Sequence, residues 1–285
     1  MTKRLLAALI ATVALATPSV GWTPACDALT SAQKRLAERL LASEYVYDCC
    51  DETIARCLTA RPTCALAVRL ADNVCRRVAQ GQDEARIRRA LSRRARSMVG
   101  SGTHAEVDLS SAPTFGSPDA AVTVVIYACA RCPYCSRLVP ALHRAVTAEP
   151  LQGEARLVFR AFPIRGHQDS TEAGLAFVAA AEMGRFWEFL LYAYGHFETF
   201  SVGVQPDWAT AVGLDPVAFS ARLTDPATRE ALVASKKEGL VNGVEETPTL
   251  FINGRQWVGD LEIEEVINAI EEEAAQVRGR TWADR

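Results

Sequence analysis

The sequence has few histidines, little net charge and no long apolar run in its interior. Its 31 basic and 34 acidic residues leave a formal net charge of −3, which gives no sign of a nucleic-acid partner, and none is expected. Four histidines and no Cys-x-x-Cys-His sequence exclude the usual attachment motif of a c-type haem. With 49% hydrophobic and 23% charged residues over 285 positions, the chain is instead typical of a globular protein with one large or two modest domains.

The first apolar run has the layout of a secretory signal peptide. Two basic residues precede the apolar segment 5–16, which ends in a small-x-small sequence at 14–16. The segment is shorter than the roughly 20 apolar residues that span a bilayer, and no other run is long enough. We therefore expect residues 1–16 to be a cleaved signal peptide and the protein to be exported to the periplasm, with an uncleaved anchor as the alternative.

Export changes the meaning of the nine cysteines, because oxidising compartments preserve disulfides. Six of them precede residue 80: Cys26, Cys49, Cys50, Cys57, Cys64 and Cys75. Helical patterns at 29–47, 51–59, 64–79 and 83–98 surround them and predict a small all-α domain over 26–99. A core of this size is marginal, so we expect disulfides to staple the helices. The sequence does not choose their pairing; a second redox relay and a metal site are the alternatives.

Charge is unevenly distributed along the chain. Residues 61–100 hold ten arginines against three acidic residues, whereas 262–273 is rich in glutamate. The arginines predict either a solvated helix face or a face that contacts an anionic membrane surface or an acidic partner.

A polar stretch with glycine and proline predicts a linker at 100–117, followed by an α/β domain over 118–278. The elements expected there are strands at 122–127 and 155–162, a helical block at about 170–242, a hairpin at 249–258 and a helix at 262–275. The first strand is apolar almost throughout, as in strands buried on both faces. Asn253-Gly254 is the preferred turn of a hairpin.

The sequence Cys132-Pro-Tyr-Cys135 lies between the first of these strands and an apolar-periodic helix. A thiolate at a helix N-terminus is stabilised by unpaired N–H groups and the helix dipole, so we expect the pKa of Cys132 to be low. Pro133 fits the first turn, where its missing N–H has no intrahelical partner. The motif predicts a redox dithiol in which Cys135 resolves; a static disulfide and two ligands of a metal site are the alternatives.

Several stretches in this order resemble the DsbA-like branch of the thioredoxin superfamily. They are Cys132-Pro-Tyr-Cys135, 157–163 with His167, Gly184-Arg-Phe-Trp-Glu188, and 243–254 with Thr247-Pro248. The resemblance implies a thioredoxin-like α/β fold with an inserted helical subdomain, here preceded by a small disulfide-stapled all-α domain. It also implies a cis Pro248 that faces the dithiol and a Thr247 backbone that binds an extended substrate peptide beside Pro133 and Tyr134. His167 and Trp187 are expected to pack or position rather than catalyse.

The function that follows is an exported protein thiol-disulfide oxidoreductase that forms or rearranges disulfides without a cofactor or metal. Its expected partners are cysteine-containing protein substrates and a redox protein that recycles the dithiol. Tyr134 offers no cation to the Cys132 thiolate, so we expect a less oxidising dithiol than that of the strongest oxidases.

Cys129, one Cys-x-x spacing upstream of the dithiol, departs from the family pattern. It is either a buried spectator or a competing partner for Cys132. Two other functions stay open. Residues 64–98 resemble the three-helix domain of CcmH-like proteins, which favours a disulfide reductase for metalloprotein or cytochrome maturation. A non-enzymatic copper carrier would use Cys129, Cys132 and Cys135.

Overall fold

The computed structural model describes residues 23–100, 104–110 and 112–279. The signal peptide predicted at 1–16 lies outside these residues. Among the described residues, no helix combines the length and the apolar character needed to cross a membrane.

The N-terminal part is helical, as its sequence pattern predicts. Its helices are α1 (Pro24–Asp27), α2 (Ser31–Ser43), α3 (Ile54–Thr59), α4 (Ala65–Ala79) and α5 (Glu84–Val99). Capping explains two of the starts: the Thr30 hydroxyl accepts from the Gln33 N–H before α2, and the Asp83 carboxylate accepts from the Arg86 N–H before α5. Leucines, valines and four of the six cysteines share one buried cluster inside these helices.

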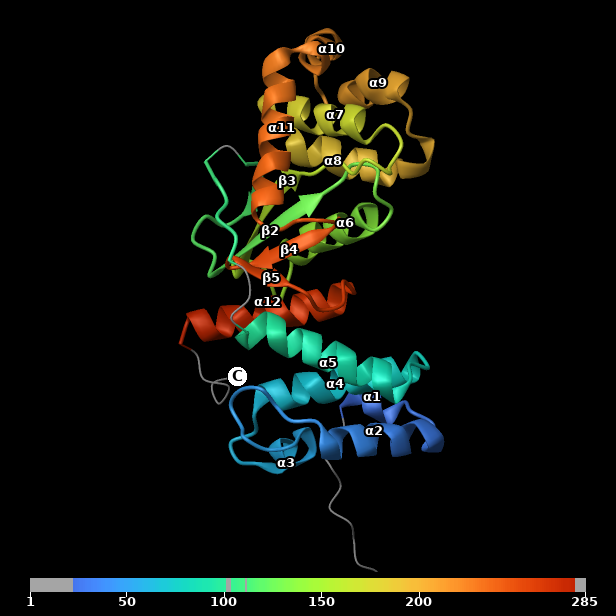
Figure 1. Cartoon of the computed structure of the whole chain (residues 1–285), viewed down its shortest axis with the longest axis vertical. Helices are drawn as coiled ribbons and strands as arrows, with labels where there is room; N and C mark the ends of the chain where they lie inside the picture. Colours follow the sequence, from blue (N-terminus) through green and yellow to red (C-terminus); the bar gives the residue numbers. More distant parts are fainter. Residues whose placement is uncertain (1–22, 101–103, 111, 280–285) are drawn as a thin grey trace, which may run out of the picture.

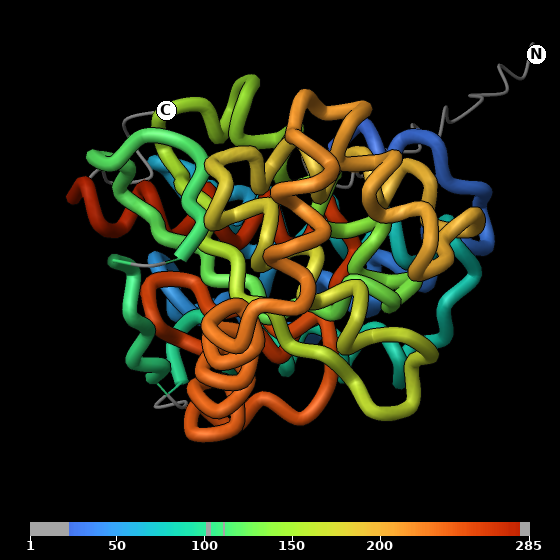
Figure 2. The backbone as a smooth tube through the Cα atoms, turned by 90° about the horizontal axis from the view of Figure 1, so that it is seen from above, coloured from blue at the N-terminus to red at the C-terminus, as the bar shows by residue number. Residues whose placement is uncertain are grey.

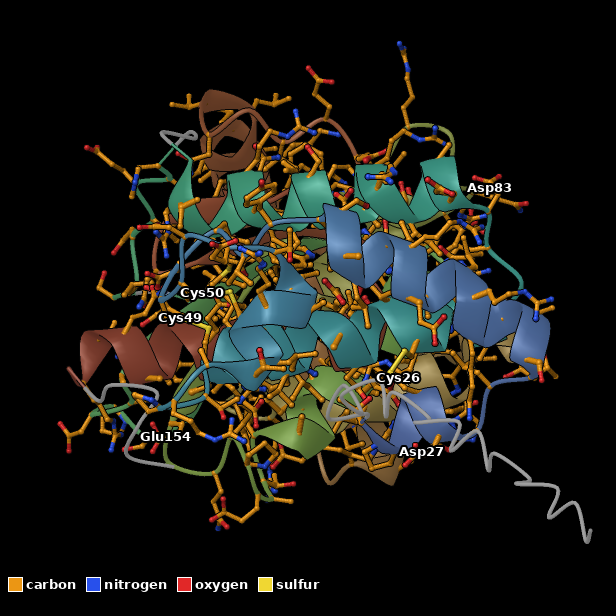
Figure 3. All side chains as sticks on the ribbon, turned by 90° about the horizontal axis from the view of Figure 1, so that it is seen from below. Cys26, Asp27, Cys49, Cys50, Asp83 and Glu154 are labelled. Carbon is orange, nitrogen blue, oxygen red and sulfur yellow. A yellow bond between two sulfur atoms is a disulfide. The ribbon has the colours of Figure 1, made fainter. Side chains whose placement is uncertain are left out.

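All six cysteines of this part are paired in disulfides. The pairs are Cys26–Cys75, Cys49–Cys64 and Cys50–Cys57. Cys26–Cys75 joins α1 to α4, while the other two bonds anchor the loop between α2 and α3. Figure 3 shows Cys49 and Cys50 side by side on that loop. The structural disulfides predicted from the cysteine count are therefore present, with a pairing that the sequence does not reveal.

A five-stranded sheet forms the centre of the second part, in the order β1-β3-β2-β4-β5. The strands are β1 (Thr114–Gly116), β2 (Val122–Ala128), β3 (Ala155–Ala161), β4 (Thr249–Ile252) and β5 (Arg255–Trp257). β2 runs parallel to β3 and antiparallel to β4. The two strands expected from apolar runs are thus the central pair, and Asn253-Gly254 forms the turn between β4 and β5.

The stretch 100–117 is not simply the linker that its composition suggests. β1 lies within it and pairs antiparallel with β3. Upstream of β1, Ala105, Val107, Leu109 and Ala112 pack against one face of the sheet. A strand of three residues is too short to show a period of two, so its pairing depends on β3 rather than on a local pattern.

The remaining helices cover both faces of the sheet. They are α6 (Cys135–Ala145), α7 (Ser170–Glu182), α8 (Phe186–Gly195), α9 (Gln205–Ala211), α10 (Pro216–Thr224), α11 (Pro226–Val241) and α12 (Ile263–Val277), with short 3₁₀ turns at Phe197–Thr199 and Val202–Val204. The block α7–α11 confirms the helical insertion, and prolines begin α10 and α11. Seen from above in Figure 2, the yellow and orange helices of this block lie over the sheet.

Alternate residues of β2 face different helices. Val124 and Ile126 belong to the buried cluster that includes residues of α6, α8 and α12, whereas Val125 and Tyr127 belong to a second cluster, and the Tyr127 hydroxyl donates to Glu238 of α11 at 2.6 Å. Gly239 in α11 makes this second contact close, because a Cβ there would lie 2.7 Å from the Phe162 ring. The predicted burial of this strand on both faces is confirmed.

Helix α12 lies between the sheet and the N-terminal helices, as Figure 1 shows. Its carboxylates pair with arginines of α4 and α5. The pairs of this charged interface are Arg69–Glu271, Arg76–Glu264, Arg94–Glu265 and Arg94–Glu272, and Arg77 and Arg93 pair with Asp260 just before α12. These five arginines are therefore interface residues. Arg61, Arg86, Arg89 and Arg96 of the same stretch are exposed, and a contact of theirs with a membrane surface or an acidic partner stays a prediction. The two oppositely charged stretches of the sequence bind each other.

Candidate active site around Cys132

The dithiol lies where β2 ends and α6 begins. β2 ends at Ala128, and the chain turns through Cys129 before it reaches Cys132, whose carbonyl accepts from the Ser136 N–H at 3.0 Å. Helix α6 begins at Cys135, so Cys132 lies in the turn that leads into the helix rather than in the helix itself. Both sulfur-bearing residues are buried, with exposed fractions of 1% for Cys132 and 0% for Cys135.

The two thiols have opposite acidities. A hydrogen bond from the Cys135 thiol is the main reason that the pKa of Cys132 falls to about 5, while burial opposes the shift. The backbone N–H groups of Cys135 and Tyr134 and a contact with Thr247 lower it further. Burial raises the pKa of Cys135 well above its usual value. The low pKa of Cys132 agrees with the expectation, although its first cause is the partner thiol rather than the helix dipole.

The predicted companion of the dithiol lies beside it. The Thr247–Pro248 peptide is cis, as the family resemblance implies. The Cys132 thiol contacts the Thr247 carbonyl oxygen at 3.3 Å. These residues are 115 positions apart in the sequence, and the pairing of β2 with β4 brings them together.

The other two predicted contact residues are on the surface next to Cys132. Pro133 is exposed, and Tyr134 has 64% of its surface accessible. The Arg137 guanidinium lies over the Tyr134 ring, 5.3 Å from its centroid. Both side chains are placed to meet a molecule that approaches Cys132, and their role in binding stays a prediction.

Cys129 is buried against His167 rather than exposed to solvent. Its sulfur lies 3.3 Å from His167 Nδ1 and accepts from the Arg131 N–H at 3.4 Å. Burial raises the pKa of this thiol, which keeps it neutral. Of the two interpretations open at this position, the geometry favours the buried spectator, and it places His167 as a packing partner of Cys129.

Trp187 belongs to another part of the fold. Its indole N–H donates to the Thr114 carbonyl at 2.9 Å, and its ring packs with Phe115 and His143. The expectation that Trp187 packs or positions is thus met by its packing against β1 and the His143 ring of α6.

The helical block contributes residues that sequence patterns do not reveal. Arg131 lies 4.6 Å from the Phe197 ring centroid and 4.4 Å from that of Phe200, and it donates to the Phe197 carbonyl at 2.8 Å. The buried Tyr194 donates to the Cys129 carbonyl at 3.2 Å. These contacts hold the end of α8 against the dithiol loop, which is the segment 129–134 between β2 and α6.

A cleft of about 360 Å³ lies between that loop and the end of α8. Pro133, Ser136 and Arg137 line one side, and residues 194–199 line the other. Its position beside Cys132 suits the side chain of a bound peptide. Within the described part of the chain, no group of three or more histidines, cysteines or carboxylates has the geometry to hold a metal ion.

Comparison with known proteins places this fold in a family. A family model described as Thioredoxin matches residues 109–272. Among solved structures, BdbD from Bacillus subtilis superposes with a TM-score of 0.55 at 20% identity, covering 61% of this chain and 98% of that one. The alpha-DsbA1 protein of Wolbachia pipientis gives 0.53 at 17% identity, covering 61% and 96%. At these identities the likeness is one of fold.

Curated relatives are much longer proteins. A Na(+)/H(+) antiporter NhaA 1 from Mycolicibacterium gilvum is 31% identical over 161 residues, 55% of this chain and 25% of its own length. A Na(+)/H(+) antiporter NhaA 3 from Salinispora tropica is 30% identical over 204 residues, 70% of this chain and 31% of its own length. The chain thus spans between a quarter and a third of these relatives. The match to the family model over more than half of its residues shows that the chain belongs to the thioredoxin family.

Proposed function

We propose that this protein is an exported thiol-disulfide oxidoreductase that forms or rearranges disulfides in other proteins through Cys132 and Cys135. The observation that carries the proposal is the pairing of a Cys132 thiol of pKa about 5 with a buried Cys135 whose pKa is raised. This asymmetry is what exchange requires, since the nucleophile must be a thiolate and the resolving thiol must wait as the neutral form. The Thr247 carbonyl, 3.3 Å from the Cys132 sulfur, offers backbone for a substrate peptide beside the nucleophile and supports the same function.

Oxidation of a substrate begins with the Cys132–Cys135 disulfide. A substrate thiolate attacks the Cys132 sulfur, the bond to Cys135 breaks, and Cys135 takes the electron pair and then a proton because its pKa is raised. A second substrate thiolate attacks the substrate sulfur of the mixed disulfide. The substrate disulfide forms, and the electron pair leaves on Cys132 as a stabilised thiolate. A redox protein that accepts two electrons must then restore the Cys132–Cys135 bond.

The substrate is proposed to be an extended peptide that contains cysteine. Its backbone would lie along Thr247, next to the Cys132 sulfur, in the manner of an added strand. Tyr134 and Arg137 would meet its neighbouring side chains on the cleft side. Ion transport, the activity in the names of the antiporter relatives, is not part of the proposal, because the match covers only a minor part of those proteins.

Export is proposed from the pattern at 1–16 together with the three disulfides. Disulfides persist in oxidising compartments such as the periplasm, whereas cytosolic thiols are kept reduced. The three disulfides of the N-terminal helices are therefore consistent with an oxidising compartment.

The reduction potential of the dithiol tests both the function and its direction. A lower pKa of the nucleophile stabilises the reduced form and makes the disulfide more oxidising. The value of about 5 for Cys132 lies between about 7 for thioredoxin and about 3.5 for DsbA. We therefore expect a potential between about −270 mV and about −120 mV.

The measurement is equilibration with glutathione buffers, followed by alkylation and mass spectrometry of the peptide that carries Cys132. The Cys129→Ser variant is the control and should give the same potential, because the Cys129 thiol is buried and neutral. A potential near −120 mV would contradict the expectation of a weaker oxidant, and a dithiol that does not equilibrate with glutathione would contradict the function.

A further inference from the structure

The three disulfides differ in exposure. Cys26 and Cys75 are fully buried, with exposed fractions of 0%. Cys49, in contrast, is exposed on the loop between α2 and α3, where Figure 3 labels it beside Cys50. Its partner Cys64 is 5% exposed. An attacking thiolate would therefore approach the Cys49–Cys64 bond from the Cys49 side.

The sulfur that would leave in such an attack is placed to carry a negative charge. Cys64 is the N-cap residue of α4, a helix of 15 residues, and its sulfur accepts from the Ala67 N–H at 3.4 Å. Free N–H groups and the helix dipole stabilise a thiolate at this position. A stabilised thiolate is a better leaving group, so exchange at this bond is faster.

The neighbouring Cys50–Cys57 disulfide lacks this arrangement. Cys50 is half-buried and Cys57 is fully buried. The Cys57 sulfur lies 3.5 Å from the Glu52 carbonyl oxygen, which would repel a thiolate. The Cys64 sulfur also has a carbonyl oxygen nearby, that of Asp48, but at the longer distance of 3.9 Å and opposed by the Ala67 N–H donor. Of the three disulfides in the described part of the chain, Cys49–Cys64 is thus the one in which the attacked cysteine is exposed and the leaving thiolate is stabilised by a helix N-terminus.

We propose that Cys49–Cys64 is a second site of thiol-disulfide exchange, separate from Cys132 and Cys135. A thiolate of another molecule attacks the Cys49 sulfur, the Cys49–Cys64 bond breaks, and the electron pair leaves on the Cys64 sulfur. Return attack by Cys64 on Cys49 restores the bond and releases the thiol. If a second external thiolate instead attacks the mixed disulfide at its external sulfur, an external disulfide forms and both cysteines are reduced.

The charge around Cys49 defines the partner. Asp48, Asp51 and Glu52 are all exposed in the same loop, and because, within the described residues, only Glu52 is paired with an arginine there, Arg56 at 3.1 Å, the loop keeps a negative charge. Asp48 holds the loop by accepting from the Cys49 N–H at 2.7 Å. Exposed carboxylates attract cations and repel anions over roughly 8 to 10 Å at moderate ionic strength. The site therefore suits a thiol carried on a basic surface, and it disfavours an acidic one.

The two exchange sites do not share a core. Cys132 and Cys135 pack with the sheet and its helices, whereas Cys57 and Cys64 pack inside the N-terminal helices. Figure 1 shows α3 at the end of the molecule away from the helical block that covers the dithiol. The second site does not depend on the first, and it can be tested with the first removed.

The test uses the full-length Cys132→Ser/Cys135→Ser variant with its three disulfides formed. The protein is treated with cysteamine, a cationic thiol, or with 2-mercaptoethanesulfonate, an anionic one, then acid-quenched, alkylated and mapped by mass spectrometry. We expect cysteamine on Cys49 and a free, alkylated Cys64, with opening at least tenfold faster than at Cys26–Cys75. Per thiolate, cysteamine should react several-fold faster than the anion, and added salt should shrink this ratio.

Two further variants in the same background locate the reaction. Cys49→Ser/Cys64→Ser should lose the fast adduct, and Cys50→Ser/Cys57→Ser should keep it. Opening no faster than that of Cys26–Cys75, or an adduct on Cys64 or Cys50 instead of Cys49, would overturn the proposal. Mapping of the unsubstituted disulfides gives this answer even if a paired serine variant fails to fold, and none of these outcomes bears on Cys132.

Discussion

Replacing Cys132 with serine should lower the rate of thiol-disulfide exchange at the active site by at least about a thousandfold, because the protein can then no longer form the Cys132–Cys135 disulfide that a substrate thiolate attacks. The measurement is the rate at which the oxidised protein forms a disulfide in a peptide with two cysteines. Serine keeps nearly the same size at a position that is 1% exposed, so the fold should persist. Circular dichroism of the variant checks that it does.

Two matched variants separate this loss from general damage. Cys129→Ser should retain the rate within about threefold, because its thiol faces His167 and is kept neutral by burial. Cys135→Ser should retain attack by Cys132 on a disulfide but should stop at the mixed disulfide. If Cys132→Ser keeps substantial activity while Cys129→Ser loses it, the nucleophile is Cys129 and the site is wrongly assigned.

Replacing Arg94 with methionine should destabilise the protein by about 3–5 kcal/mol, the usual cost of removing one partner of a buried ion pair. Arg94 is 2% exposed and donates to Glu265 at 3.0 Å and to Glu272 at 2.8 Å. Its loss leaves two carboxylates buried at the charged interface. Denaturant unfolding of the variant and the parent gives the difference in free energy.

The control for this change is Arg96→Met on the same helix. Arg96 is exposed, so its replacement should change stability by no more than about 0.5 kcal/mol. The triple variant Arg94→Met/Glu265→Gln/Glu272→Gln should recover much of the loss, since no charge is then left unpaired. Equal effects of Arg94→Met and Arg96→Met would contradict the structural role of this interface.

The Arg94→Met defect should also depend on pH. Burial raises the pKa of Glu272 even with Arg94 present, and without the arginine it should rise further. A carboxyl group whose pKa is raised in the folded state favours folding while it is protonated, and that contribution is lost as pH rises through the folded pKa. The variant should therefore be closest to the parent in acid and furthest from it at neutral pH.

Much of the candidate site follows from local sequence. The apolar run of β2 and the spacing of Cys132 and Cys135 are enough to place a dithiol after a buried strand, whereas the cis Pro248 beside it follows only from the resemblance to DsbA-like proteins. The strand and the dithiol are readable because each depends on a few adjacent residues. The low pKa of Cys132 also follows, although its main cause is the Cys135 thiol.

Other features depend on contacts between distant segments. β1 forms because its residues pair with the edge of β3. Arg131 contacts Phe197 because the helical block packs over the dithiol loop. Disulfide pairing depends on how the N-terminal helices pack. The sequence shows the arginines at 61–100 as a charge cluster, but only the tertiary fold shows that carboxylates of α12 pair with several of them.

The pH dependence of Cys132 alkylation in the reduced protein tests the central claim most directly. Alkylation by iodoacetamide requires the thiolate, which for a pKa of about 5 is present above that pH and is lost as pH falls through it. We predict a half-maximal rate at Cys132 near pH 5, with Cys129 and Cys135 reacting only at much higher pH. A midpoint near the usual thiol value of about 8.5, or faster labelling of Cys129 than of Cys132, would contradict the assignment of Cys132 as the nucleophile.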